Sequence, residues 1–373
     1  MQDKSDIRIA IATQGTLKPM GVFYGNYVQY LPYKKIILFG GMTPYFYQGT
    51  SLRRQKLLRY WYTLITLNNT KKIEKLVTRR TIKILKKEKI NCVLAEFMNT
   101  GAGMIEACKV LNIPIVTTVM GYEIHKKDVV ERNKVKYKKL ANYKTIAIPV
   151  AKNMIPKLKK VGFTDDQISY SPIGAKEEFF AITPNYFSKK FLAIGRFTAS
   201  KSPQSTIKAF ATVAKKYPEA KLIMAGDGEE LASSKKLVND LGIQKNVDFI
   251  GWIDREKQKQ LFAECFAFVQ HSVTAPNGDV EGTPVVIIEA SAAGLPIIST
   301  QHGGIVDTVM NGKTGFLVQE YNITAMSEKM MYLYENPEIA EKIGKDGKKF
   351  ISENFSIQHH IRKVSDAIET VLK

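Results

Sequence analysis

Short apolar runs alternate with longer amphipathic stretches along the chain, and this pattern predicts strands and helices in turn. Continuous apolar runs are typical of strands buried on both faces, as in parallel sheets covered by helices. We expect strands at 7–12, 36–39, 92–95, 115–119, 145–148 and 168–170, then at 191–194, 221–225, 247–250, 267–270, 296–299 and 315–318. Intervening helices include 203–217 and 229–241. The alternation predicts an α/β protein with two doubly wound, Rossmann-like domains.

The chain has 373 residues, which is enough for two domains of ordinary size. We expect the first domain to cover 1–184 and the second to cover 185–356, with a linker at 182–188. Ligands of doubly wound sheets bind at the carboxyl ends of the strands. With two such domains facing each other, the expected binding site is a central cleft between them.

Two carboxylates, Glu281 and Glu289, flank the start of a predicted helix. Pro284 suits the first helical position, where a missing N–H costs nothing, and Thr283 suits the N-cap. The helix should stop at Gly294, which can adopt the left-handed conformation. The residues alone leave two interpretations open. One is a capping carboxylate and a buried ion pair, and the other is ligand binding beside the positive end of the helix.

The motifs around these glutamates resemble the donor half of family 4 retaining glycosyltransferases, which have the GT-B fold. In chain order they are 191–197 with Lys201, 222–228, 247–252, 281–289, 294–300, 303–307 and 311–318. Because they occur in the expected order, their combination is far more specific than any one of them. Within the family, the segment 277–284 is most similar to exopolysaccharide enzymes of the colanic-acid type. The resemblance also implies that the last helix, within 357–373, returns to the first domain.

The resemblance assigns roles to residues of the second domain. Arg196 and Lys201 would contact the donor diphosphate, whose departure requires positive charge. Glu289 would accept hydrogen bonds from the ribose hydroxyls, while Glu281 would contact the donor sugar and orient it. We therefore name Glu281, Arg196 and Lys201 as catalytic residues. The other expected donor contacts are Gly15, Gly195, Gly251, Trp252, Gly282, Thr283 and Pro284.

Trp252 and Gly15 each also have a structural interpretation. Trp252 lies at the turn where the family holds the nucleobase, and a tryptophan there could equally belong to the core. Gly15 follows the first strand, where a glycine allows phosphates to approach the backbone. A glycine after a strand is also a common structural feature.

The first half departs from the family pattern, which often has a His-Gly-x-Asp element after a strand. Here Met120 occupies the histidine position and Glu123 the acidic position, while His125 is out of register. Glu96 stands where related chains often carry a histidine. We expect Met120, Glu123 and His125 to lie on the acceptor side of the site. By itself, His125 is more typical of a structural or solvent-facing residue.

The net charge of +20 is confined to the first half of the chain. Residues 1–190 hold 34 Lys and Arg against 13 Asp and Glu, whereas residues 191–373 hold 21 against 22. Basic residues alternate with Leu, Tyr and Trp in 53–64, and a second basic cluster occupies 134–139. The first pattern is typical of a helix that lies on an anionic membrane surface, and also of a solvated helix face. Nucleic-acid binding is disfavoured because no recognition motif accompanies the charge.

The three cysteines, Cys92, Cys108 and Cys265, are widely separated and form no Cys-x-x-Cys or Cys/His cluster. This spacing predicts neither a disulfide framework nor a zinc site, and it fits a reducing cytoplasm. We expect no cofactor and no metal, with a nucleoside diphosphate sugar as the substrate. No apolar leader and no window long enough to span a bilayer occur in the sequence. We therefore expect a cytoplasmic protein, peripheral on the inner face of the membrane.

These observations predict a retaining, metal-independent glycosyltransferase of the hexosyltransferase type. It would transfer a sugar to a glycan or lipid-linked acceptor in surface polysaccharide biosynthesis. Two alternatives stay open at this point. One is an isomerase that resembles nucleotide-sugar 2-epimerases, and the other is a non-catalytic partner that binds sugar nucleotides.

Overall fold

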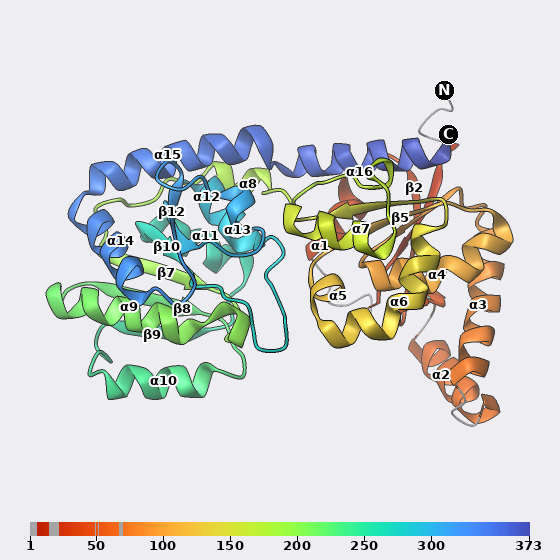
Figure 1. The fold of residues 1–373 in the computed structure, drawn as a ribbon, viewed down its shortest axis with the longest axis horizontal. Coiled ribbons are helices and arrows are strands. Elements are labelled where there is room, and N and C mark those ends of the chain that lie inside the picture. Colours follow the sequence, from red (N-terminus) through yellow and green to blue (C-terminus); the bar gives the residue numbers. More distant parts are fainter. Residues whose placement is uncertain (1–5, 15–21, 49, 51, 67–69) are drawn as a thin grey trace. The chain divides into compact units, whose positions relative to one another are not determined.

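A computed structural model describes residues 6–14, 22–48, 50, 52–66 and 70–373 of the chain (Figure 1). The chain divides into two compact units. The first contains Met1–Ser171 and His360–Lys373, and the second contains Pro172–His359. Each unit is built on one six-stranded sheet. The predicted α/β class with two doubly wound domains is therefore confirmed.

In the first unit the sheet has the order β3-β2-β1-β4-β5-β6. Its strands are β1 (Arg8–Ala12), β2 (Lys34–Phe39), β3 (Phe46–Tyr47), β4 (Cys92–Ala95), β5 (Ile115–Val119) and β6 (Thr145–Pro149). All pairs are parallel except β3, which is antiparallel to β2. The helices are α1 (Val22–Tyr30), α2 (Leu52–Thr66), α3 (Thr70–Lys87), α4 (Met98–Leu111), α5 (Tyr122–His125), α6 (Lys127–Ala141), α7 (Ile155–Val161) and α16 (Ile357–Leu372).

In the second unit the sheet is parallel throughout, with the order β12-β11-β10-β7-β8-β9. Its strands are β7 (Lys190–Ile194), β8 (Lys221–Ala225), β9 (Val247–Gly251), β10 (Ala267–Val269), β11 (Ile297–Thr300) and β12 (Gly315–Val318). The helices are α8 (Glu177–Phe180), α9 (Pro203–Lys216), α10 (Leu231–Asp240), α11 (Arg255–Glu264), α12 (Val285–Ala293), α13 (Ile305–Thr308), α14 (Ile323–Glu335) and α15 (Pro337–Asn354). Numbered within each unit, both sheets have the strand order 3-2-1-4-5-6.

Alternate residues of the second sheet pack into two separate hydrophobic cores. Phe191 of β7 packs with Phe210 of α9 on one face, while Leu192 packs with Ile287 of α12 on the other. Successive side chains of a strand point to opposite faces, so helices must cover both sides to bury such a run. This double burial explains the continuous apolar runs in the sequence.

The boundary between the units differs from the predicted division at 184/185. Ala175 donates its N–H to the carbonyl of Phe355 at 2.8 Å, and Phe179 is fully buried in a core of the second unit. The predicted linker at 182–188 is also wrong, because Tyr186 is buried in the same unit and donates to the Gly294 carbonyl at 2.8 Å. Apolar and aromatic residues in this connection anchor it to the second unit. At the other crossing, Tyr33 of the first unit donates to Glu369 of α16 at 3.1 Å.

Two further predictions need local correction. The strand expected at 168–170 forms only an isolated bridge between Ile168 and Ala147. The segment soon reaches Pro172, which has no N–H to donate to a neighbouring strand. The helix expected to begin at Pro284 begins at Val285, and Pro284 itself is the N-cap, in place of Thr283. The other end agrees with the prediction, since Gly294 is left-handed with φ +98°.

Candidate functional site

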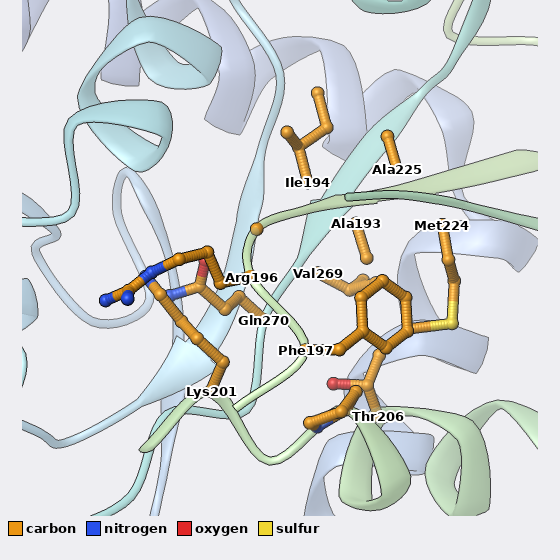
Figure 2. Close-up of a pocket in the computed structure, with 12 residues that line it drawn as sticks. Ala193, Ile194, Arg196, Phe197, Lys201, Thr206, Met224, Ala225, Val269 and Gln270 are labelled. Carbon is orange, nitrogen blue, oxygen red and sulfur yellow. The ribbon is translucent and has the colours of Figure 1, made fainter. Parts of the chain in front are cut away.

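The strand order of the second sheet reverses between β7 and β10, and a small pocket lies at this point. Doubly wound sheets bind their ligands where the order reverses, outside the carboxyl ends of the strands. The residues that follow β7 supply Gly195 and Arg196, and the residue that follows β10 supplies Gln270. Figure 2 shows Arg196, Lys201 and Gln270 gathered on one side of this pocket.

Gly195 leaves space in the pocket because it has no side chain. A Cβ placed on Gly195 would lie 3.8 Å from Lys201 carbon atoms and 3.9 Å from Gln270 Oε1, which are ordinary contact distances. Gly226 at the neighbouring loop differs, because its φ is +132° and a Cβ there would lie 1.9 Å from the Gly195 carbonyl oxygen. Gly226 is therefore required by the backbone, whereas the space at Gly195 is available to a ligand.

The pocket carries two cations in different states. Arg196 is exposed, and its guanidinium has no hydrogen-bond or ion-pair partner among the described residues. Lys201 lies on the short turn before α9 and forms an ion pair with Glu281, with only 15% and 18% of the two side chains exposed. A phosphate that enters the pocket would meet the unpaired Arg196 directly and would compete with Glu281 for Lys201.

Glu289 of α12 has two protein partners. Arg255 Nη1 lies 2.6 Å from Oε1, and Gln258 Nε2 donates to Oε2 at 2.7 Å. Burial raises the pKa of the Glu289 carboxyl, and the attraction of Arg255 opposes this shift. The ion pair that the sequence left open is therefore present. The ribose contact stays a prediction, because a carboxylate has further lone pairs beyond those used here.

The predicted base-binding turn is open to solvent. Trp252 is 80% exposed, so it is not part of the core. Gly251 has φ +71°, and its carbonyl accepts the N–H of Gly226 at 2.7 Å. An exposed indole on a fixed turn offers a flat face on which a nucleobase can stack. Arg255 begins the helix that follows this turn, so α11 links the turn to Glu289.

The loop before α12 keeps Glu281 near Gly303 and Gly304. Gly304 donates its N–H to the Gly282 carbonyl at 2.8 Å, and a Cβ on Gly303 would lie 2.1 Å from the Glu281 carbonyl oxygen. Thr283 is buried beside this contact region. The structure therefore brings the predicted residues Arg196, Lys201 and Glu281 together, while Glu289 and Trp252 belong to a neighbouring group around α11.

Sequence reasoning missed Gln270 and His302. Gln270 is 5% exposed, its Nε2 donates to Ser272 Oγ at 2.8 Å, and its Oε1 has no partner among the described atoms. Buried polar atoms are nearly always hydrogen-bonded, so this oxygen marks a place for a ligand donor. The sequence placed Gln270 within the strand at 267–270, and the available signal was a polar residue at a strand end. His302 is likewise buried beside Glu281.

At the carboxyl ends of β1 and β4, two described side chains of the first unit are hydrogen-bonded to each other. Glu96 follows β4 and accepts the hydroxyl of Thr13, which follows β1, at 2.7 Å. Burial raises the pKa of the Glu96 carboxyl. Gly15, predicted to approach the phosphates, lies outside the described residues.

The predicted acceptor residues also lie in this region. Glu123 is completely buried and accepts the backbone N–H groups of Met120 at 2.8 Å and Gly121 at 3.0 Å. Burial raises the pKa of Glu123. His125 is buried as well, with Nδ1 in contact with Lys157 Nζ, so of its two expected positions, structural or solvent-facing, the structural one agrees with the structure. Because both carboxylate oxygens of Glu123 hold backbone groups, we assign this residue a structural role in place of an acceptor contact.

The basic helices of the first unit fall into two kinds. On α6, Lys134, Lys136 and Lys139 each pair with a glutamate. On α2 and α3, the described residues offer no acidic partner to Lys56, Lys71, Lys75 or Arg79. Beside these cations, α2 exposes about half or more of each of four apolar side chains, which are Leu57, Tyr60, Trp61 and Leu64. Their spacing of three and four residues places them on one face of the helix.

The described residues contain neither a metal-binding cluster nor a helix that could span a membrane. No group of three or more His, Cys, Asp and Glu side chains is arranged to hold a metal ion there. No described helix combines the length and apolarity that a bilayer-spanning segment requires. Cys92, Cys108 and Cys265 are free and buried.

Most of the second unit is similar to a known protein family. Residues 175–350 match the family described as "Glycosyl transferases group 1". This match covers almost all of the second unit and includes Arg196, Lys201, Glu281 and Glu289. The resemblance inferred from the sequence motifs is therefore confirmed for residues 175–350.

Two relatives and one solved structure extend the comparison. "Amylovoran biosynthesis glycosyltransferase AmsK" of Erwinia amylovora is 26% identical over 235 residues, 62% of this chain and 58% of that protein. "Putative colanic acid biosynthesis glycosyltransferase WcaL" of Salmonella typhimurium is 22% identical over 274 residues, 72% of this chain and 68% of that protein. The crystal structure of Anabaena Alr3699/HepE in complex with UDP and glucose is similar over 98% of this chain and 100% of its own, with a TM-score of 0.75 and 16% identity. The predicted GT-B fold is confirmed.

Proposed function

We propose that this protein transfers a glycosyl group from a nucleoside diphosphate sugar to a glycan or lipid-linked acceptor in polysaccharide synthesis. The observation that carries the proposal is the pocket between β7 and β10, where the unpaired Arg196 lies beside the Lys201–Glu281 pair. Cations placed where negative charge develops stabilise a departing diphosphate. The names of the two relatives, which are glycosyltransferases of amylovoran and colanic acid biosynthesis, support the same reaction class.

The proposed roles follow from the placement of the groups. Arg196 and Lys201 bind the diphosphate. Glu281 is thereby displaced from Lys201, and its carboxylate accepts hydrogen bonds from hydroxyl groups of the donor sugar. Gln270 Oε1 accepts a second sugar hydroxyl, because phosphate oxygens at neutral pH offer no proton to this acceptor. Trp252 stacks on the nucleobase, and Glu289 reaches the ribose. The solved neighbour was crystallised with UDP and glucose, which supports a nucleotide sugar as the donor.

We further propose that the reaction retains the anomeric configuration and needs no metal ion. The bond from the anomeric carbon to the diphosphate oxygen breaks, and the acceptor oxygen bonds on the same face. The departing diphosphate oxygen then takes the acceptor proton. Arg196 and Lys201 supply the positive charge that a metal ion would otherwise contribute. We expect EDTA to leave the rate within about twofold, and NMR of the product to show the donor's anomeric configuration. Strict dependence on added metal, or inversion, would contradict this mechanism.

The main experiment incubates the pure protein with a panel of sugar nucleotides and a membrane lipid extract, followed by mass spectrometry. We expect a new glycosylated product and release of nucleoside diphosphate. Lys208→Ala, an exposed cation on α9 away from the pocket, serves as the matched control for Arg196→Ala. An isomeric sugar nucleotide without an acceptor product would indicate an epimerase instead. Binding without any turnover would indicate a non-catalytic partner.

We also propose that α2 holds the protein on the inner, anionic face of a membrane. Exposed apolar patches of this kind are unusual on monomeric soluble proteins, and unpaired cations beside them attract anionic lipid by about 1 kcal/mol each. On α6, Lys136 and Lys139 are paired with glutamates, so they provide an internal control.

Vesicle sedimentation tests this attachment. We expect binding to vesicles that contain phosphatidylglycerol, weak binding to pure phosphatidylcholine, and weakening with added salt. The double substitution Trp61→Gln and Leu64→Gln should lower the affinity at least about tenfold, while Lys136→Gln and Lys139→Gln on α6 should have little effect. Binding that is indifferent to lipid charge and salt would exclude this role for α2.

A further inference from the structure

A single histidine–glutamate pair touches both ends of the loop that carries Glu281. Thr274, early in the loop between β10 and α12, donates its N–H to Glu320 Oε2 at 2.9 Å. Glu281, late in the same loop, donates its N–H to His302 Nε2 at 3.1 Å. His302 Nδ1 lies 2.6 Å from Glu320 Oε1, which joins the two anchors. We call His302 and Glu320 the clip.

The contacts of His302 determine which ring nitrogen carries the proton. A backbone N–H can only donate, so Nε2 must be the unprotonated acceptor for Glu281. Nδ1 then carries the hydrogen and donates it to Glu320. Only 1% of the His302 side chain is exposed, so water does not replace either partner. The ring can serve Glu281 only in this neutral form, because a second proton would place a donor against the Glu281 N–H.

The charged and titratable groups around the clip are consistent with this arrangement. Burial alone would raise the pKa of Glu320, but hydrogen bonds from Thr274 and His302 outweigh it and lower the pKa below its usual value. His271, in the loop after β10, approaches Glu320, and burial lowers the His271 pKa to about 4, so its ring is neutral. On the other side, Glu281 is paired with Lys201. Glu320 is therefore an anion that can hold the Nδ1 hydrogen of His302.

We propose that the His302–Glu320 clip is a positioning device that fixes the Glu281 carboxylate for the donor sugar. The inference rests on the proposed function, since it assumes that Glu281 contacts the donor. His302 and Glu320 are positioning residues because they act on the substrate only through Glu281. The contacts of Gly303 and Gly304 with residues 281–282 are independent of the clip. Loss of the clip should therefore shift Glu281 without unfolding the loop.

Two substitutions at one position separate positioning from packing. The side-chain oxygen of His302→Gln reaches about as far as Nε2 and can still accept from Glu281. The shorter amide of His302→Asn reaches only as far as Nδ1, so it can still donate to Glu320 but leaves the Glu281 N–H unpaired. We expect the donor KM to rise about tenfold or more in the Asn variant and to stay within about threefold in the Gln variant.

A merely structural histidine predicts a different outcome. Equal KM changes in both variants, in proportion to their loss of thermal stability, would overturn the proposal. A second measurement does not depend on turnover. Long-range proton–nitrogen NMR of histidine-labelled protein should show His302 with a proton on Nδ1 and none on Nε2 at neutral pH. A proton on Nε2 would overturn the clip, whereas a correct tautomer in a protein that transfers no sugar would overturn only the proposed function.

Discussion

The two sheets have the same strand order, yet the points where that order reverses differ in chemistry. In the first unit, Thr13 and Glu96 close this point with a buried hydrogen bond. In the second unit, the equivalent positions after β7 and β10 carry Arg196, which is exposed and unpaired, and Gln270, whose Oε1 has no partner among the described atoms. The topology therefore offers a binding position twice. Among the described residues, the side chains of the second unit leave hydrogen-bonding and charge requirements unmet, and this difference supports the proposal that the donor binds there.

The sharpest way to break this comparison is to remove the unpaired cation. Arg196→Ala should reduce kcat/KM for transfer by at least about a hundredfold, because groups that stabilise developing charge typically contribute this much. Steady-state kinetics would measure it, with Lys208→Ala as the control. Activity retained in Arg196→Ala would indicate that the cations of this pocket do not bind the diphosphate.

Filling the open space should have the next largest effect. Gly195→Ala adds a methyl group at ordinary contact distance from Lys201 and Gln270, so the fold should persist while donor affinity falls about tenfold. Gly226→Ala should instead destabilise the protein, because its Cβ would meet backbone 1.9 Å away at φ +132°. Calorimetric titration and thermal unfolding of both variants would distinguish these effects. Unchanged donor affinity in a folded Gly195→Ala protein would place the donor elsewhere.

A smaller effect is expected at Gln270. Gln270→Leu removes the free acceptor and the hydrogen bond to Ser272, whereas Ser272→Ala removes only that hydrogen bond. We expect the first change to raise the donor KM about fivefold to tenfold and the second to leave it nearly unchanged, since one hydrogen bond to a ligand contributes about 0.5–1.5 kcal/mol. Equal effects of the two changes would show that Gln270 acts through Ser272 alone.

The smallest effect concerns the closed point of the first unit. Burial raises the folded-state pKa of Glu96 above its unfolded value. The stability linked to its proton is therefore fully present below the unfolded pKa of about 4.3 and is lost as the pH rises through the folded pKa. Glu96→Gln keeps an acceptor for Thr13 and carries no charge. Urea unfolding at a series of pH values between 4 and 7 should show that the free energy of unfolding falls less with rising pH in this variant than in the wild type. Parallel pH dependences of the two proteins would contradict the raised pKa of Glu96.

The strand pattern could be predicted from the sequence because parallel strands are buried on both faces. The same logic missed β3, whose two residues are too few to make an apolar run. The family motifs named Arg196 and Lys201, which line one pocket, and Glu281, which pairs with Lys201. Gln270 and His302 could not be found this way, because their significance depends on unpaired or shared hydrogen bonds between segments distant in sequence. Glu123 and His125 were expected on the acceptor side of the site, yet both side chains are buried, and burial depends on the fold.

The predictions of the linker at 182–188 and of the start of α12 were wrong for a related reason. From the sequence alone, Tyr186 is typical of a loop. In the structure its hydroxyl donates a hydrogen bond to the carbonyl of Gly294, which lies more than a hundred residues later in the chain. By local capping preferences, Thr283 would be the N-cap and Pro284 the first helical residue. The hydrogen bond from Gly304 to the Gly282 carbonyl keeps the preceding chain non-helical, so the helix begins one residue later, at Val285. Long-range backbone contacts thus override local preferences at both places.

The most direct test of the central claim is amide hydrogen exchange with and without saturating nucleoside diphosphates, using UDP and GDP as probes. At least one of them should slow exchange in 195–201, after β7, and in 270–284, before α12, while leaving the segment 96–101 after β4 unchanged. Protection confined to the first unit, or no protection by either probe, would contradict the assignment of the donor site to the second.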